Sequence, residues 1–168
     1  MKKLFSLLDK ARHSSFSRTI LNLATNRAIP YNRPHGIKII EVFDEGIKAR
    51  LPYRRINQNH LRGLHACALA TLSEFTAGMT LTHCMRSDAY RLIMKDLNMV
   101  YHYQGKTDVM VSCIIPKDRL EKEVYIPLKD QDAVFIEIQI ETYDTEKNHI
   151  CTAKVNWQIK KWDHVKAK

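Results

Sequence analysis

Residues 64–85 read LHACALATLSEFTAGMTLTHCM, and this segment says most about how the chain folds. Its one formal charge is Glu74. Threonine, serine and histidine recur along it, so the segment is too polar to span a membrane. A helix this poor in charge is expected to be buried on nearly all sides, inside a wrapping sheet or at an interface.

The two sides of this helix differ in the size of their residues. One side carries bulky side chains suited to a hydrophobic core: Leu61, Leu64, Ala68, Leu69, Leu72, Phe75 and Met79. The other carries small residues around one carboxylate: Gly63, Cys67, Ala70, Thr71, Glu74, Ala77 and Gly78. Small residues let another backbone or a ligand approach closely. A buried stripe of this kind is poorly explained in a monomer, so we expect a homodimer.

The segments on either side of the helix predict an antiparallel sheet. Residues 37–51 alternate around Asp44-Glu45-Gly46 as a β-hairpin does. Residues 124–126 are expected to add a short strand within a charged loop. Longer candidate strands lie at residues 92–103, 109–115, 134–141 and 151–159. Their alternation indicates half-buried strands, so the expected fold is α+β, with one sheet wrapped around one helix.

A basic amphipathic helix is expected over residues 3–27, and Ser14-Ser15 is the position where it would break or bend. Its apolar residues recur at helical spacing: Leu4, Leu7, Leu8, Ala11, Phe16, Ile20, Leu23 and Ala24. Prolines then end it, which divides the chain into this N-terminal helix, residues 1–29, and one domain, residues 30–168. We expect the helix to pack on the domain; peripheral contact with a membrane surface is the alternative.

Composition and charge narrow the classes of function. The chain of 168 residues is 45% hydrophobic and 27% charged, which excludes collagen-like, low-complexity and wholly disordered proteins. Residues 1–62 hold 13 basic and 4 acidic side chains, whereas residues 63–168 hold 14 of each, so the net charge of +9 belongs to the N-terminal third. A basic region attracts a polyanion: nucleic acid, acidic lipid or a phosphate-rich small molecule.

The four cysteines, at positions 67, 84, 113 and 151, form no C-x-x-C pair and no cluster with histidine at zinc spacing. They fall mostly on predicted apolar faces, as buried free thiols do. The apolar stretch near the N-terminus is too short to predict a signal peptide. We therefore expect a cytoplasmic protein without a metal.

Glu74 is the first candidate for chemistry. Burial in an apolar helix disfavours an ionised carboxylate, so the pKa of Glu74 is expected to be raised. Proteins use such a group for general acid/base work, for nucleophilic attack or within a hydrogen-bond network. The structural alternative is a carboxylate that bonds to a neighbouring strand or reaches solvent at the edge of the helix.

The loop before the helix is the second candidate, because it carries Asn59, Gly63 and His65. The first N–H groups of a helix lack internal partners and can bind an oxyanion or a phosphate; an ordinary helix cap is the alternative. Arginine suits phosphate, and four arginines lead into this loop: Arg50, Arg54, Arg55 and Arg62. A solvated surface is the alternative for that cluster.

At this loop and helix the sequence resembles the hotdog-fold thioesterases. The phenylacetate-type subgroup has an Asn, a Gly and then His-Gly-Gly opening its central helix, with Asp or Glu nine residues after that His. Asn59, Gly63 and His65 stand in this order, and Glu74 is nine residues after His65. Two features differ: Ala66-Cys67 replaces Gly-Gly, and the spacing from Gly63 to His65 is one residue shorter than the commoner form.

The resemblance covers residues 30–160 and implies a hotdog fold, in which a curved antiparallel sheet wraps a long central helix. It implies an acyl-CoA thioesterase that works as a homodimer or a dimer of dimers, with its sites at the dimer interface. Coenzyme A would be part of the substrate, and no separate cofactor is implied.

The resemblance also implies residue roles. Glu74 would act on an acyl thioester, as a base toward water or as a nucleophile. Asn59 and His65 would orient the substrate or the water, and backbone N–H groups near Ala66 and Cys67 would stabilise the oxyanion. The arginines would meet the phosphates of coenzyme A, which gives these substrate-binding residues: Gly63, Ala66, Cys67, Arg54, Arg55 and Arg62.

Other functions stay open. A non-catalytic protein that binds acyl-CoA or lipid would keep the same groove without turnover, and a thioester of acyl carrier protein is an alternative substrate. A dehydratase on this fold would need His65 and Glu74 to converge. Nucleic-acid binding is not expected, because a coenzyme A site explains a localised basic region.

Overall fold

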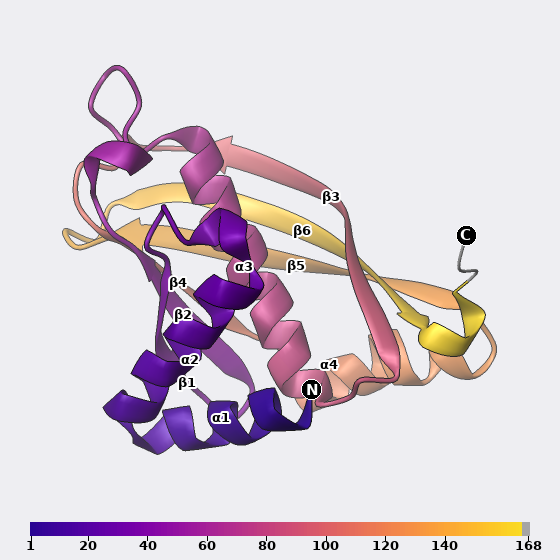
Figure 1. Ribbon diagram of the computed structural model, residues 1–168. Coiled ribbons are helices and arrows are strands. Elements are labelled where there is room, and N and C mark those ends of the chain that lie inside the picture. Colours follow the sequence, from indigo (N-terminus) through magenta and orange to yellow (C-terminus); the bar gives the residue numbers. More distant parts are fainter. Residues whose placement is uncertain (166–168) are drawn as a thin grey trace.

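A six-stranded antiparallel sheet curves around one long helix in the computed structural model, which describes residues 1–165 (Figure 1). The predicted α+β arrangement is therefore confirmed. The sheet order is β1-β2-β4-β5-β6-β3. The strands are β1 (Lys38–Val42), β2 (Gly46–Leu51), β3 (Tyr90–Tyr101), β4 (Val109–Ile114), β5 (Ala133–Asp144) and β6 (His149–Lys161). Residues 166–168, the end of the predicted domain, lie outside the described part of the chain.

Helix α3 (Ala66–Met85) is the central helix, and its polar residues are accommodated by hydrogen bonds within the helix. The hydroxyl of Ser73 donates to the Leu69 carbonyl at 3.1 Å, and that of Thr76 donates to the Leu72 carbonyl at 2.7 Å. Such bonds let hydroxyls lie in an apolar core without leaving a buried polar group unpaired.

The burial of α3 differs between its two sides. The bulky side is buried as predicted, apart from Leu61, which lies in the preceding loop and is 64% exposed. The small-residue side is not fully covered by its own chain. Ala77 is buried, but Cys67 is exposed and the remaining helical members are half-buried: Ala70, Thr71, Glu74 and Gly78. Within the single chain the sheet therefore fully covers the bulky side alone, and burial of the small-residue side at an interface stays a prediction.

Two helices stand where one was expected at the N-terminus. Helix α1 (Lys2–His13) ends at Ser14, whose side chain accepts a hydrogen bond from the Ser17 N–H at 3.2 Å and so begins α2 (Ser15–Ala28). This N-cap explains why the chain breaks at the serine pair. Both helices pack on the domain, at the lower left of Figure 1.

Residues 117–129 are helical, so the short strand predicted at residues 124–126 is wrong. Helix α4 (Lys117–Leu120) continues as a π-helical turn over Glu121–Tyr125 and a 3-10 turn over Pro127–Lys129. Leu120, Val124 and Leu128 are buried at intervals of four residues, which is a helical spacing. Three further 3-10 turns are Pro30–Asn32, Arg55–Asn57 and Trp162–His164.

Within residues 1–165, no helix has the length and apolar character needed to cross a membrane. All four cysteines are free thiols. Cys113 and Cys151 are buried and Cys84 is half-buried, in line with the prediction, whereas Cys67 is exposed at the start of α3.

Candidate functional site

Glu74 lines a cavity of about 210 Å³ between the middle of α3 and strands β3 and β6. It is the only charged residue there; the others are Ile29, Phe75, Gly78, Met79, Thr82, Leu92 and Trp157. Ile29 follows the end of α2, so the N-terminal segment also contributes to the cavity wall. The cavity therefore offers apolar walls to a substrate and one group, the Glu74 carboxylate, that can transfer a proton.

The electrostatics of Glu74 follow from its partial burial. Desolvation raises the pKa of this carboxyl above the ordinary value, in the direction expected from the sequence. Within residues 1–165 the carboxylate has no hydrogen-bond or ion-pair partner to offset that cost. The arrangement leaves a carboxylate of increased basicity available to a water or ligand in the cavity.

Trp157 closes one wall of the same cavity and explains a glycine in α3. A Cβ at position 78 would lie 2.9 Å from Cη2 of the indole, so the ring takes the space that a side chain would fill. The buried indole N–H has no hydrogen-bond partner in residues 1–165. The sequence carries no signal that Trp157 is a site residue, because its alternation in strand β6 indicates only that it points inward.

The loop before α3 is held in place by asparagine side chains. Oδ1 of Asn59 accepts hydrogen bonds from the N–H groups of Leu61 and Gly63, at 2.9 and 3.0 Å. The buried Asn57 also fixes the loop: its side chain donates to the His35 and Pro52 carbonyls, and its own carbonyl accepts from the His65 N–H at 2.7 Å. Asn59 therefore shapes the loop.

His65 is the N-cap of α3. Its Nδ1 accepts a hydrogen bond from the Cys67 N–H at 3.1 Å, so that donor is already occupied within the chain. The Ala66 N–H has no acceptor in residues 1–165. Asn59 and Ala66 line a second cavity, of about 300 Å³, together with residues at the end of β3, including Tyr101.

The candidate residues thus fall into two places along α3. Asn59, Gly63, His65, Ala66 and Cys67 lie together at its N-terminal end. Glu74 follows Ala66 by eight residues, a rise of about 12 Å along a helix axis. A single chain therefore does not bring the loop and the carboxylate into one cavity, which also separates His65 from Glu74.

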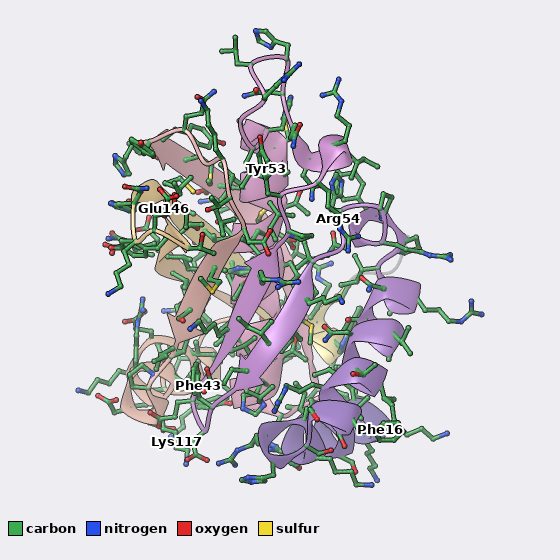
Figure 2. The ribbon with its side chains drawn as sticks, turned by 90° about the vertical axis from the view of Figure 1, so that its left-hand side faces the viewer. Phe16, Phe43, Tyr53, Arg54, Lys117 and Glu146 are labelled. Atoms are coloured by element: carbon green, nitrogen blue, oxygen red, sulfur yellow. The ribbon has the colours of Figure 1, made fainter. Side chains whose placement is uncertain are left out.

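The predicted phosphate-binding arginines are solvent-exposed near this loop. Arg54 and Arg55 follow β2, and Arg62 lies in the loop itself; all three are exposed and make no ion pair within residues 1–165. Figure 2 shows Arg54 toward the top of the molecule, close to Tyr53. Arg50 differs, because it pairs with Asp108 at 3.4 Å. Exposed guanidinium groups at one end of the helix suit a phosphate-bearing ligand.

Comparisons with solved structures agree with this fold. A protein from Pseudomonas aeruginosa named as a probable thioesterase is 17% identical, with a TM-score of 0.77; the match covers 83% of this chain and 93% of that one. A thioesterase from Haemophilus influenzae is 14% identical over 90% of this chain and 95% of that one, with a TM-score of 0.67. At such identities the likeness shows the fold, and the predicted hotdog fold is confirmed.

A protein of unknown function from Chlorobaculum tepidum shares the same architecture at 14% identity, with a TM-score of 0.73 over 90% of this chain and 99% of that one. None of the curated proteins compared with the chain matches it. One family model does match, over residues 17–159, and its description is a domain of unknown function, DUF4442. Since this match spans most of the sequence, the chain belongs to the DUF4442 family.

Proposed function

We propose that the protein is an acyl-CoA thioesterase in which Glu74 is the catalytic carboxylate. The observation that carries this proposal is the position of Glu74: a half-buried carboxylate of raised pKa, without a partner in residues 1–165, in an otherwise uncharged cavity. The two structural neighbours named as thioesterases support it. Within the hotdog enzymes, the order Asn59, Gly63, His65 and Glu74 favours the phenylacetate-type branch.

The reaction is hydrolysis of the thioester bond. Glu74 accepts a proton from a water molecule as the water oxygen attacks the thioester carbonyl, and the resulting oxyanion is stabilised by the backbone donor at Ala66. The C–S bond then breaks, which releases the carboxylic acid, and Glu74 returns the proton to the leaving thiolate of coenzyme A to form its thiol. The exposed arginines Arg54, Arg55 and Arg62 bind the phosphates of coenzyme A.

A homodimer would assemble this site, because one chain holds its two halves about 12 Å apart. Strand β3 is an edge of the sheet, paired with β6 alone among the described strands. Ile93, Met94, Val100 and Tyr101 are exposed on this strand. Unpaired edges of this length favour pairing with a second copy. Two-fold pairing through β3 would bring the loop of one chain to Glu74 of its partner.

A thiol-release assay tests the proposal. The wild-type protein is expected to hydrolyse at least one of acetyl-, octanoyl-, palmitoyl- and phenylacetyl-CoA, and Glu74→Ala to lose that activity. Glu137→Ala is the matched control, because Glu137 lies exposed on β5 and pairs with Lys154. Hydrolysis by Glu74→Ala at the wild-type rate would contradict the proposed role of Glu74.

One observation favours a second candidate, a non-catalytic acyl-CoA binder. The Cys67 N–H is occupied by its own cap, His65, so the oxyanion site has one backbone donor fewer than a free helix end offers. Calorimetry separates the two functions. Acyl-CoA binding without turnover, unchanged in Glu74→Ala, would establish the binder.

A further inference from the structure

The outward face of α2 is apolar. Phe16, Ile20 and Leu23 are 73%, 40% and 67% exposed, and their spacing places them on one side of the helix. The same helical spacing in α1 gives a buried face, with Leu8 and Ala11 inside the core. We call Phe16, Ile20 and Leu23 the α2 stripe; Figure 2 shows its first member, Phe16, near one end of the helix at the edge of the molecule.

The opposite face of α2 fixes this orientation. Leu21 and Thr25 are buried. The side chain of Asn22 donates to the Ile39 carbonyl at 3.0 Å and accepts from the Ile39 N–H at 2.7 Å, which ties the helix to edge strand β1. Because this double hydrogen bond and the buried residues hold the helix, the α2 stripe cannot rotate toward the core.

The segment that carries the α2 stripe is positively charged, and the first acidic residue after it is Glu41 on β1. Residues 10–40 hold six basic side chains and no acidic one. Arg12 is paired with Asp44, but Lys10, Arg27, Arg33 and Lys38 are exposed and make no ion pair within residues 1–165. An apolar helical face flanked by lysine and arginine is typical of helices that lie in the surface of an anionic bilayer.

We infer that the α2 stripe docks the protein on a bilayer that carries anionic lipid. The helix has 14 residues, about 21 Å, and would lie along the surface with its apolar side chains among the acyl chains. A second copy of the chain fits less well, because two-fold contact through this face would oppose its own positive charges.

Docking through α2 also has a consequence for the Glu74 cavity. Ile29 directly follows α2 and lines that cavity. The bilayer surface would therefore lie close to one wall of the cavity, where an amphiphilic acyl compound arrives from the membrane. The docking itself does not depend on the thioesterase proposal and is measured without any substrate.

Vesicle co-sedimentation of the full chain tests the inference. The vesicles are phosphatidylcholine alone, or phosphatidylcholine with about 30% phosphatidylglycerol to supply negative charge. The test variant is Phe16→Gln/Ile20→Gln/Leu23→Gln, which keeps good helix formers in α2. The control variant is Ile114→Thr/Phe135→Thr. It replaces two exposed apolar side chains on the sheet, away from α2; Ile114 is 58% exposed and Phe135 is 48% exposed.

The wild type and the control are expected to bind the anionic vesicles and to release them at high salt. The test variant should bind at least about tenfold more weakly than the wild type, while its circular dichroism spectrum stays unchanged. No binding by the wild type, or equal binding by the test variant, would overturn the inference. So would sedimentation velocity in which the test variant alone dissociates an oligomer, because a second copy would then cover the stripe.

Discussion

His65 and Cys67 are joined by a hydrogen bond from the Cys67 N–H to Nδ1 of His65, at 3.1 Å. This bond caps α3 and occupies one of the two backbone donors at its start. The Ala66 N–H then becomes the donor on which an oxyanion would depend. The first prediction isolates that donor.

Ala66→Pro removes the Ala66 N–H at little cost to the helix. Ala66 is the first residue of α3, a position that favours proline, and His65 before it has the extended backbone that proline requires, with φ −70° and ψ 137°. Turnover should fall about 10²–10³-fold, as for loss of an oxyanion donor, while stability in urea stays the same. Undiminished thiol release would remove this N–H from the mechanism.

His65 should contribute to turnover as well as to the stability of the helix that it caps. Asn is a good N-cap, so His65→Asn should preserve the urea midpoint, whereas His65→Ala should lower the free energy of unfolding by about 1 kcal/mol. If the imidazole also orients the substrate, turnover should fall about tenfold in both variants. Wild-type turnover in His65→Asn would show that His65 acts only as the helix cap.

Ionisation of Glu74 should lower stability as the pH rises. Its pKa is raised in the folded protein, so the folded state binds the proton more tightly than the unfolded state does. The associated stability is present below the unfolded pKa and is lost as the pH rises through the folded pKa. Glu74→Gln cannot ionise, so its stability relative to the wild type should increase as the pH rises. Thermal unfolding of both proteins from acid to neutral pH checks this. Parallel plots of unfolding temperature against pH would mean that burial does not raise the pKa of Glu74.

Gly78 and Trp157 should be energetically coupled. Gly78→Ala places a Cβ 2.9 Å from the indole, and the resulting overpacking should cost about 1–3 kcal/mol, against about 1 kcal/mol gained in helix propensity. In a Trp157→Phe background the smaller ring should relieve the clash, leaving Gly78→Ala neutral or stabilising. Urea unfolding of the four proteins gives the coupling directly. The same cost in both backgrounds would show that the indole does not restrict position 78.

The sequence was sufficient for the central helix and for most of the sheet because both show in local patterns. Residues 64–85 carry a single charge, Glu74, and the strands alternate. The failure at residues 124–126 has a local cause as well: Val-Tyr-Ile has high β propensity, and the helical spacing of Leu120, Val124 and Leu128 appears only over a longer window.

The site could be predicted less completely because it depends on contacts between distant segments. The sequence identifies Glu74 as a carboxylate with raised pKa, but Trp157 meets Gly78 only after β6 has packed on α3. Likewise, the spacing of Phe16, Ile20 and Leu23 predicts an apolar helix face without saying whether the domain covers it. Exposure of that face is set by Asn22, which binds β1 from the other side.

The most direct test of a shared Glu74 site mixes two inactive variants, Glu74→Ala and Ala66→Pro, after reversible dissociation. If each site combines Glu74 of one chain with the loop of its partner, a mixed dimer has one intact site. Random reassortment should then restore about a quarter of wild-type thiol release. If both parts of the site come from one chain, every site in the mixture keeps a lesion. Verified mixed dimers without recovered activity would contradict the shared site.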